Sequence, residues 1–263
     1  MVKTIAITNQ KGGVGKTTTA VNLAASLAAL RRRVLLVDLD PQGNASMGCG
    51  IQPQSASMEG VLLQSIPMIS AIVHLPYGFS ILPADQRLAS VEAQLMTQED
   101  HEHVLEGLLL SVQDRYDYVL IDCPPATNLL TMNALVAADS VLIPVQCEYY
   151  ALEGLAGLLK TIHHCRHTAN PRLVIEGLLR TMYDGRNRLT LEVSDQLLNH
   201  FEDRVYHTVI PRNVRLAEAP SHGRPARQYD ASAQGAKAYL ALAAELIQKQ
   251  VSDQVLQMEL QHE

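Results

Sequence analysis

The residues with the clearest chemical potential lie in one glycine-rich run, Lys11-Gly12-Gly13-Val14-Gly15-Lys16-Thr17-Thr18. Glycines allow consecutive backbone N–H groups to curve around an anion without Cβ clashes. A helix that begins at Lys16 would direct its positive end at the same anion. Lys16 would then neutralise the β- and γ-phosphate oxygens, and the Thr17 hydroxyl would bind Mg²⁺. The run therefore predicts a site for the phosphates of ATP and for Mg²⁺ built from residues 11–18.

This loop departs from the usual P-loop spacing at its first residue. A Gly-x-x-x-x-Gly-Lys-Thr motif requires glycine six residues before Lys16, where this chain has Gln10. The Gly-Lys-Thr core is kept, and Lys11 is an additional cation at the start of the loop. From the residues alone, Lys11 is either a solvated loop lysine or a second group that acts on phosphate.

Three aspartates follow two of the expected strands. Asp38 and Asp40 come directly after the apolar run 34–37, and Asp122 comes after the run 118–121. Ligands of open α/β sheets gather at the carboxyl ends of strands, so we expect these side chains beside the phosphate loop. Asp122 is the candidate to hold Mg²⁺ directly or through water, while Asp38 supports the loop and the metal shell. An isolated aspartate after a strand is also often only a helix cap.

Strand-like apolar runs alternate with helical runs along the chain, which predicts an α/β P-loop fold with a doubly wound, mostly parallel sheet and helices on both faces. Most strand runs are continuously apolar, as expected for strands that are covered on both sides. The expected strands are 4–8, 34–37, 79–82, 118–121, 140–145, 173–179 and 205–210. The expected helices are 16–30, 86–96, 102–112, 128–137, 151–163, 189–199 and 233–250, with short helices and loops over 43–76. Residues 1–250 are interpreted as a single domain and 251–263 as a polar tail that frays.

Composition favours a soluble, reduced protein with a large aliphatic core. Hydrophobic residues make up 47% and charged residues 18% of the 263 residues, which argues against a disordered chain. The net charge of −6 provides no global basic field for nucleic acid, although a local basic face would suffice. The four cysteines form no C-x-x-C pair, and neither a signal peptide nor an apolar run of ~20 residues is present, so we expect a cytoplasmic protein.

The glycine-rich loop resembles the deviant Walker A motif, K-G-G-x-G-K-[ST], of the ParA/MinD family of dimeric ATPases, which includes the nitrogenase iron protein. Similar blocks cover 37–44, 121–125, 144–154 and 210–223, and the last two most resemble ParA proteins of the Soj type. The resemblance implies that Lys11 reaches across a dimer interface to phosphates bound by the other subunit. It also implies that Asp40, close to the metal, orients or activates the attacking water. Lys11, Lys16 and Asp40 are thus the candidate catalytic residues, and Thr17, Asp40 and Asp122 the candidate metal ligands.

The resemblance also suggests where the adenine binds. In related ATPases a loop after a late strand packs on the adenine, and here that loop contains Pro211 and Asn213. Met182 and its neighbour Tyr183 could line the same pocket, or they could be ordinary core residues.

Eight arginines and no lysine lie between residues 180 and 227, in excess over the acidic residues there by two charges. On composition alone, a solvated, ion-paired surface explains that excess. In Soj-like proteins, arginines at the motif positions of Arg186 and Arg215 contact DNA phosphates, which implies sequence-independent binding to double-stranded DNA. The secondary candidates are Arg188, Arg212, Arg224 and Arg227.

Taken together, the resemblance implies an ATPase with weak basal activity that dimerises on ATP binding and then binds nucleoid DNA. A ParB-type centromere-binding protein would stimulate hydrolysis and release the dimer, so that ATP acts as a switch in chromosome or plasmid segregation. The expected location is cytoplasmic and nucleoid-associated.

Three alternatives remain at this point. A positioner of non-genomic cargo would share the ATPase and the DNA face and differ only in its partner. A MinD-like membrane-cycling ATPase would need a basic amphipathic tail, whereas residues 251–263 contain no Lys or Arg, so no membrane partner is expected. An iron–sulfur reductase would need Cys123 and Cys147 to hold a cluster, and small buried hydrophobes are the simpler interpretation of both.

Overall fold

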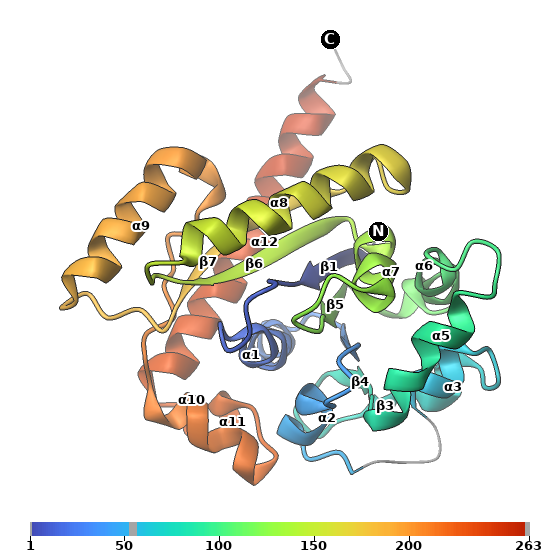
Figure 1. Cartoon of the computed structure of the whole chain (residues 1–263). Coiled ribbons are helices and arrows are strands. Elements are labelled where there is room, and N and C mark those ends of the chain that lie inside the picture. The colour runs from blue at the N-terminus through green and yellow to red at the C-terminus, as the bar shows by residue number, and fades with distance from the viewer. Residues whose placement is uncertain (1, 53–56, 261–263) are drawn as a thin grey trace.

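The computed structural model describes residues 2–52 and 57–260, with side chains described up to residue 252. Within these residues one sheet has the strand order β3-β4-β2-β5-β1-β6-β7 (Figure 1). The strands are β1 (Lys3–Ile7), β2 (Val34–Asp38), β3 (Val73–His74), β4 (Ser80–Leu82), β5 (Tyr118–Asp122), β6 (Ser140–Gln146) and β7 (Val174–Thr181). The described strand pairs are parallel except for β3 with β4. The predicted α/β fold with a mostly parallel sheet is confirmed.

Helices cover both faces of this sheet. The α-helices of the described residues are α1 (Lys16–Ala29), α2 (Asn44–Gly48), α3 (Met58–Leu62), α4 (Met68–Ala71), α5 (Val91–Leu95), α6 (Val104–Leu109), α7 (Leu129–Ala137), α8 (Ala151–Thr168), α9 (Arg188–Phe201), α10 (Val214–Glu218), α11 (Ala226–Tyr229) and α12 (Gln234–Leu260). None of them combines the length and the apolar character needed to cross a membrane.

The two layers of core follow the period-two alternation of the strands. Ile5 and Ile7 of β1 belong to the apolar cluster formed with α1 and α12, whereas Ala6 belongs to the cluster formed with α5 to α8. Figure 1 shows α7 and α8 on one side of the sheet and α1 and α12 on the other. Because both faces are covered, β2 is buried at all of its positions, as its continuous apolar run predicts.

The predicted strand 205–210 is wrong. This segment follows the edge of β7 through an isolated bridge between Leu178 and Val205, and no ladder forms. The backbone N–H groups of His207 and Thr208 donate instead to the Glu245 carboxylate of α12, at 2.7 and 2.9 Å. These donors are therefore satisfied without a regular strand.

Two helix boundaries also differ from the prediction. The expected helix 86–96 begins as the 3₁₀ turn η1 (Gln86–Ser90), where the Asp85 side chain accepts a hydrogen bond from Arg87 N, and only then becomes α5. The last helix, α12, continues to Leu260 beyond its expected end at residue 250, so residues 251–260 are helical, and fraying of the tail stays a prediction. The rest of the predicted tail, 261–263, lies outside the described residues, and the single-domain division stays a prediction.

Asn133 connects α7 to α6 through a fully buried side chain. Its Nδ2 donates to Leu129 O at 3.1 Å and to His101 O at 2.8 Å, and its Oδ1 accepts from Leu105 N at 3.1 Å. Leu105 lies in the first turn of α6, where backbone N–H groups have no partner within the helix. The Asn133 amide replaces water for these groups.

We predict that Asn133→Ala lowers the free energy of unfolding by about 1–3 kcal/mol, because Leu105 N–H and His101 O lose their buried partner. Urea unfolding monitored by circular dichroism measures the change. A loss below about 0.5 kcal/mol would show that the joint is not structural.

Candidate nucleotide site and its arginine surface

The glycine-rich loop connects β1 to α1. Gly13 and Gly15 adopt φ angles of 76° and 88°, in the left-handed region that favours glycine. A Cβ added at Gly12 or Gly13 would meet no atom within 4 Å, so this backbone faces open space. At the end of β7, the Thr181 hydroxyl donates to Val14 O at 2.8 Å and fixes the loop from the side. The loop is thus held in place with its glycine backbone accessible, as an anion cradle requires.

Lys16, the first residue of α1, is only 7% exposed. Its Nζ donates to Lys11 O at 3.3 Å. Burial lowers the pKa of the Lys16 ammonium, and the charge of Asp122 is the largest opposing influence. An ammonium has three N–H donors, so Lys16 Nζ can donate to anionic groups in addition to Lys11 O.

Asp38 and Asp122 are register partners at the ends of β2 and β5, and both are fully buried. Ser46 of α2 donates its backbone N–H and its hydroxyl to Asp38 Oδ2 at 2.8 and 2.7 Å. Desolvation raises the pKa of Asp38 to about 7, although the Ser46 hydrogen bonds oppose the rise. Ionisation of this pair therefore carries a desolvation penalty that lowers the stability of the fold.

Asp122 is the less satisfied member of this pair. Neither of its carboxylate oxygens has a hydrogen-bond partner among the described residues. Burial, followed by the charge of Asp38, raises the pKa of Asp122 well above its usual range. The Thr17 hydroxyl is near enough to favour the charged form of Asp122, but the two do not meet in hydrogen-bond geometry.

A hydrated Mg²⁺ ion fits this arrangement. The Asp122 carboxylate and the Thr17 hydroxyl are hard oxygen donors, and Asp40 is close enough for its charge to act on both Asp122 and Lys16. Asp40 is 7% exposed, and its Oδ1 accepts from Gln42 N at 2.9 Å. In the described part of the chain no three His, Cys, Asp or Glu side chains form a metal cage by themselves. Mg²⁺ typically takes one or two protein carboxylates and completes its shell with phosphate and water.

A cavity of about 180 Å³ opens beside the loop, next to Gly15. Met182, which has a φ of 48°, and Pro211 lie on its wall, and an isolated bridge between Tyr183 and Pro211 joins their two loops. Asn213 also lines the cavity, and its Oδ1 is buried without a partner among the described residues. An unused amide acceptor in a largely apolar cavity suits the exocyclic amino group of a purine. The structure brings Met182, Pro211 and Asn213 together.

Lys11 does not lie in the acidic group. Its Nζ is 3.0 Å from Glu148 Oε2, and the two side chains are 36% and 47% exposed. Glu148 follows β6 and also accepts a hydrogen bond from Gln146. An exposed ion pair contributes at most about 1 kcal/mol, so Lys11 can exchange Glu148 for another anion at little cost.

Sequence reasoning does not find Glu148, Thr181 or Ser46. The only signal for Glu148 is its place in the block 144–154, because it lies 137 residues from Lys11. Hydroxyls that donate to a distant backbone or carboxylate have no local spacing pattern, so Thr181 and Ser46 give none.

The arginines expected to contact DNA are exposed and carry their own counterions. Arg186 pairs with Asp184 at 2.9 Å with its side chain 91% exposed, and Arg215 pairs with Glu218 at 2.8 Å with its side chain 50% exposed. Arg188 pairs with Glu192 in the same way, at 2.8 Å. These are surface contacts that solvent and salt weaken.

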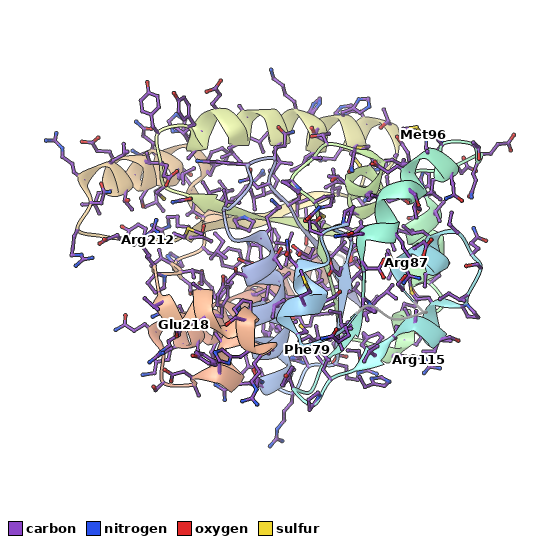
Figure 2. The ribbon with its side chains drawn as sticks, turned by 60° about the horizontal axis from the view of Figure 1, so that its bottom comes forward. Phe79, Arg87, Met96, Arg115, Arg212 and Glu218 are labelled. Carbon is purple, nitrogen blue, oxygen red and sulfur yellow. The ribbon has the colours of Figure 1, made fainter. Side chains whose placement is uncertain are left out.

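Other arginines of the span 180–227 behave differently. Arg180 is 8% exposed and donates to Ser194 Oγ and Tyr206 O, each at 2.9 Å, so it belongs to the packing around β7 and not to a basic face. Arg212 and Arg224 are exposed and form no ion pair with the described residues. Figure 2 places Arg212 and Glu218 on the side of the molecule away from Arg115.

Comparison with known proteins shows the family to which the chain belongs. A family model described as an AAA domain matches residues 2–175. The chain is 51% identical over 249 residues to the sporulation initiation inhibitor protein Soj of Bacillus subtilis, covering 94% of this chain and 98% of that protein. It is 48% identical over 255 residues to the chromosome partitioning protein ParA of Caulobacter vibrioides, with 95% of each chain covered. The chain belongs to the ParA/Soj family of chromosome-partitioning ATPases.

The ParA/Soj resemblance that the motifs indicate is thereby confirmed. A solved structure supports the same fold: cobyrinic acid a,c-diamide synthase from Mycobacterium smegmatis, with bound ADP and magnesium, superimposes with a TM-score of 0.84. That protein is 36% identical to this ParA/Soj chain, and the match covers 96% of this chain and 97% of the other.

The pKa of Asp38 predicts how the nucleotide-free protein responds to pH. A carboxyl whose folded-state pKa is raised to about 7 contributes stability at low pH that is lost as pH rises through that value. We therefore expect Asp38→Asn, which cannot ionise, to be more stable than the parent at pH 8 by roughly 2–4 kcal/mol and nearly equal to it at pH 4.

Urea unfolding between pH 4 and pH 8 without nucleotide or Mg²⁺ tests this expectation. Asp114→Asn, at an exposed position before β5, is the control and should follow the parent. Parallel pH profiles for the parent and Asp38→Asn would contradict the assignment.

Proposed function

We propose that the chain binds ATP and Mg²⁺ at the glycine-rich loop, dimerises in that state, binds double-stranded DNA without sequence preference and segregates a chromosome or plasmid with a ParB-type partner. The observation that carries the proposal is the Asp122 carboxylate, which is buried close to Lys16 and has no hydrogen-bond partner within the part of the chain that the structure describes. The backbone at Gly12 and Gly13 faces open space. A buried charge without a partner is costly, and a metal–phosphate ligand would supply one.

Each residue of the site has a distinct part in this proposal. Residues 12–18 and Lys16 hold the phosphates, Thr17 and Asp122 hold Mg²⁺, and Met182, Pro211 and Asn213 hold the adenine. Bound Mg²⁺ would neutralise charge on the phosphate oxygens. Asp40 accepts a hydrogen bond from the water that attacks the terminal phosphate and orients it.

Dimerisation is proposed because Lys11 is placed for a role outside its own site. Its ammonium is exposed at the mouth of the loop and is held by Glu148, not by the buried carboxylates. When two subunits meet face to face, the phosphates of the partner subunit offer more charge than Glu148, and the exchange favours the dimer. ATP is then shared between the subunits, and its hydrolysis releases them.

DNA binding is proposed through Arg186 and Arg215. Both are exposed, and a DNA phosphate would replace Asp184 or Glu218 as counterion. A dimer presents each arginine twice, which raises the number of phosphate contacts without any base contact. For the partner, the support is the family itself, whose members are named chromosome partitioning proteins.

We predict that Asp40→Ala retains ATP binding but lowers the hydrolysis rate by about 10²–10⁴-fold, because the attacking water loses its acceptor. The variant should accumulate as an ATP-bound dimer on DNA. Phosphate release and DNA co-sedimentation measure both effects, and Asp114→Ala serves as the control. Rapid hydrolysis by Asp40→Ala would refute the role of Asp40.

We predict that Arg215→Glu keeps ATP-dependent dimerisation but weakens DNA binding. The slope of log affinity against log salt concentration should become shallower by the equivalent of about two phosphate contacts per dimer, since each contact contributes about 0.9 to it. Arg115→Glu makes the same charge reversal on the far side of the molecule (Figure 2) and should change neither quantity. Equal salt slopes for the parent and Arg215→Glu would remove Arg215 from the DNA face.

A further inference from the structure

The segment 211–230 contains α10, the 3₁₀ turn η4 (Ala219–His222) and α11. It carries four of the arginines: Arg215 on α10, Arg227 on α11, and Arg212 and Arg224 in the loops beside these elements. We call it the arginine segment. Figure 1 shows α10 and α11 together at one end of the molecule, close to α1. A cavity of about 440 Å³ opens between the segment and the helices α1 and α2, and Thr18, Asn44 and Arg224 are among the residues that line it. Leu216, Ala219 and Ala226 of the segment are buried in the apolar cluster that also contains residues of α1 and α2, and a small number of hydrogen bonds fix the segment's position over that packing.

Asn22 forms one of these hydrogen bonds from the second turn of α1. Its side chain is 6% exposed, its Nδ2 donates to Thr18 O at 2.8 Å, and its Oδ1 accepts from Ala226 N at 2.7 Å. A carbonyl only accepts and a backbone N–H only donates, so the two contacts fix the orientation of the amide. Among the described residues no other hydrogen bond joins α1 to the arginine segment.

A second point of contact lies at α2. Gly50 and Gly223 approach so closely that a Cβ on Gly223 would lie 2.6 Å from Gly50 Cα, and Tyr77 OH donates to Gly223 O at 2.9 Å. The helix α2 is itself tied to the buried acidic pair through Ser46 and Asp38. Both points thus connect the arginine segment to elements that line the nucleotide site.

We infer that Asn22 is a positioning residue that couples the phosphate loop to the arginine segment, so that the nucleotide bound at residues 12–18 sets the DNA affinity of the arginines. Thr18 belongs to the loop, and the first turns of α1 move with it as one helix. The Ala226 N–H is bound to Asn22 and follows that movement. This inference rests on the proposed function, because it explains how ATP binding and DNA binding are linked within one subunit.

The test compares two asparagines of the same local design. Like Asn22, Asn133 is buried, donates to the carbonyl four residues before it and accepts from a distant backbone N–H. Unlike Asn22, it connects α7 to α6, far from the arginine segment. The full chain and the variants Asn22→Ala and Asn133→Ala are titrated with a random-sequence DNA duplex. Each titration is made once with Mg²⁺ and a non-hydrolysable ATP analogue and once with Mg²⁺ and ADP.

We expect the parent and Asn133→Ala to bind the duplex more tightly with the analogue than with ADP, by a factor on the order of 5–150. Asn22→Ala should bring that ratio to within about twofold of one, with nucleotide affinity and basal hydrolysis unchanged within about threefold. Thermal unfolding of the two variants shows whether their losses of stability are similar. If Asn22→Ala does not fold, Asn22→Asp keeps the size and the acceptor for Ala226 N but cannot donate to Thr18 O, and it should lose the ratio as well.

Retention of the parent ratio by the folded Asn22 variant would overturn the inference and leave the proposed function intact. Loss of nucleotide binding in Asn22→Ala would also overturn it, since Asn22 would then support the site itself. If Asn133→Ala lost the ratio to the same extent, both losses would be consequences of general destabilisation, and the inference would be overturned. If the parent shows no difference between the analogue and ADP, the proposed function fails together with the inference.

Discussion

Two carboxylates, Asp38 and Asp122, lie next to each other at the ends of β2 and β5 and are fully buried. Parallel pairing of β2 with β5 sets them side by side without solvent, and within the described residues only Asp38 has hydrogen-bond donors to stabilise it. Lys16 supplies one positive charge, which cannot balance two carboxylates and Asp40. The sheet can hold these buried aspartates because the residues that precede them in β2 and β5 are apolar and pack against helices on both faces. The aspartates can bind a cation and Lys16 can bind an anion. A triphosphate with bound Mg²⁺ would supply both charges.

Outside this buried group, the three charges that we propose for the dimer and for the main DNA contacts lie at the surface and pair with carboxylates of the same chain. Lys11 is paired with Glu148, Arg186 with Asp184, and Arg215 with Glu218. Each pair is weak enough to be exchanged for phosphate and prevents the free cation from binding anions indiscriminately. In the proposed function, exchange of these carboxylates for phosphates is how a chain with a net charge of −6 would bind DNA.

The parts that the sequence predicts are those encoded by local spacing. The loop 11–18, the aspartates at strand ends and the continuously apolar strands are recognisable because period and neighbours suffice to define them. The expected strand 205–210 does not form as a ladder because a distant carboxylate, Glu245, accepts the backbone N–H groups of His207 and Thr208, while Tyr206 N and Ile210 N still donate to β7. Glu148 and Asn22 were not recognised as contacts of Lys11 and Ala226, because the pairs lie 137 and 204 residues apart and depend on the assembled fold. An arginine count also does not reveal that Arg180 is buried, and contact of the exposed arginines with DNA stays a prediction.

We propose that a triphosphate with Mg²⁺ binds at the buried carboxylates and Lys16, and that Lys11 then joins two subunits by contacting the partner subunit's phosphates. Light scattering coupled to size-exclusion chromatography measures the mass of the protein directly in each nucleotide state. With Mg²⁺ and a non-hydrolysable ATP analogue, the mass should be twice the 28.8 kDa of one chain, and with ADP it should be that of one chain. A mass of one chain in both states would contradict the account.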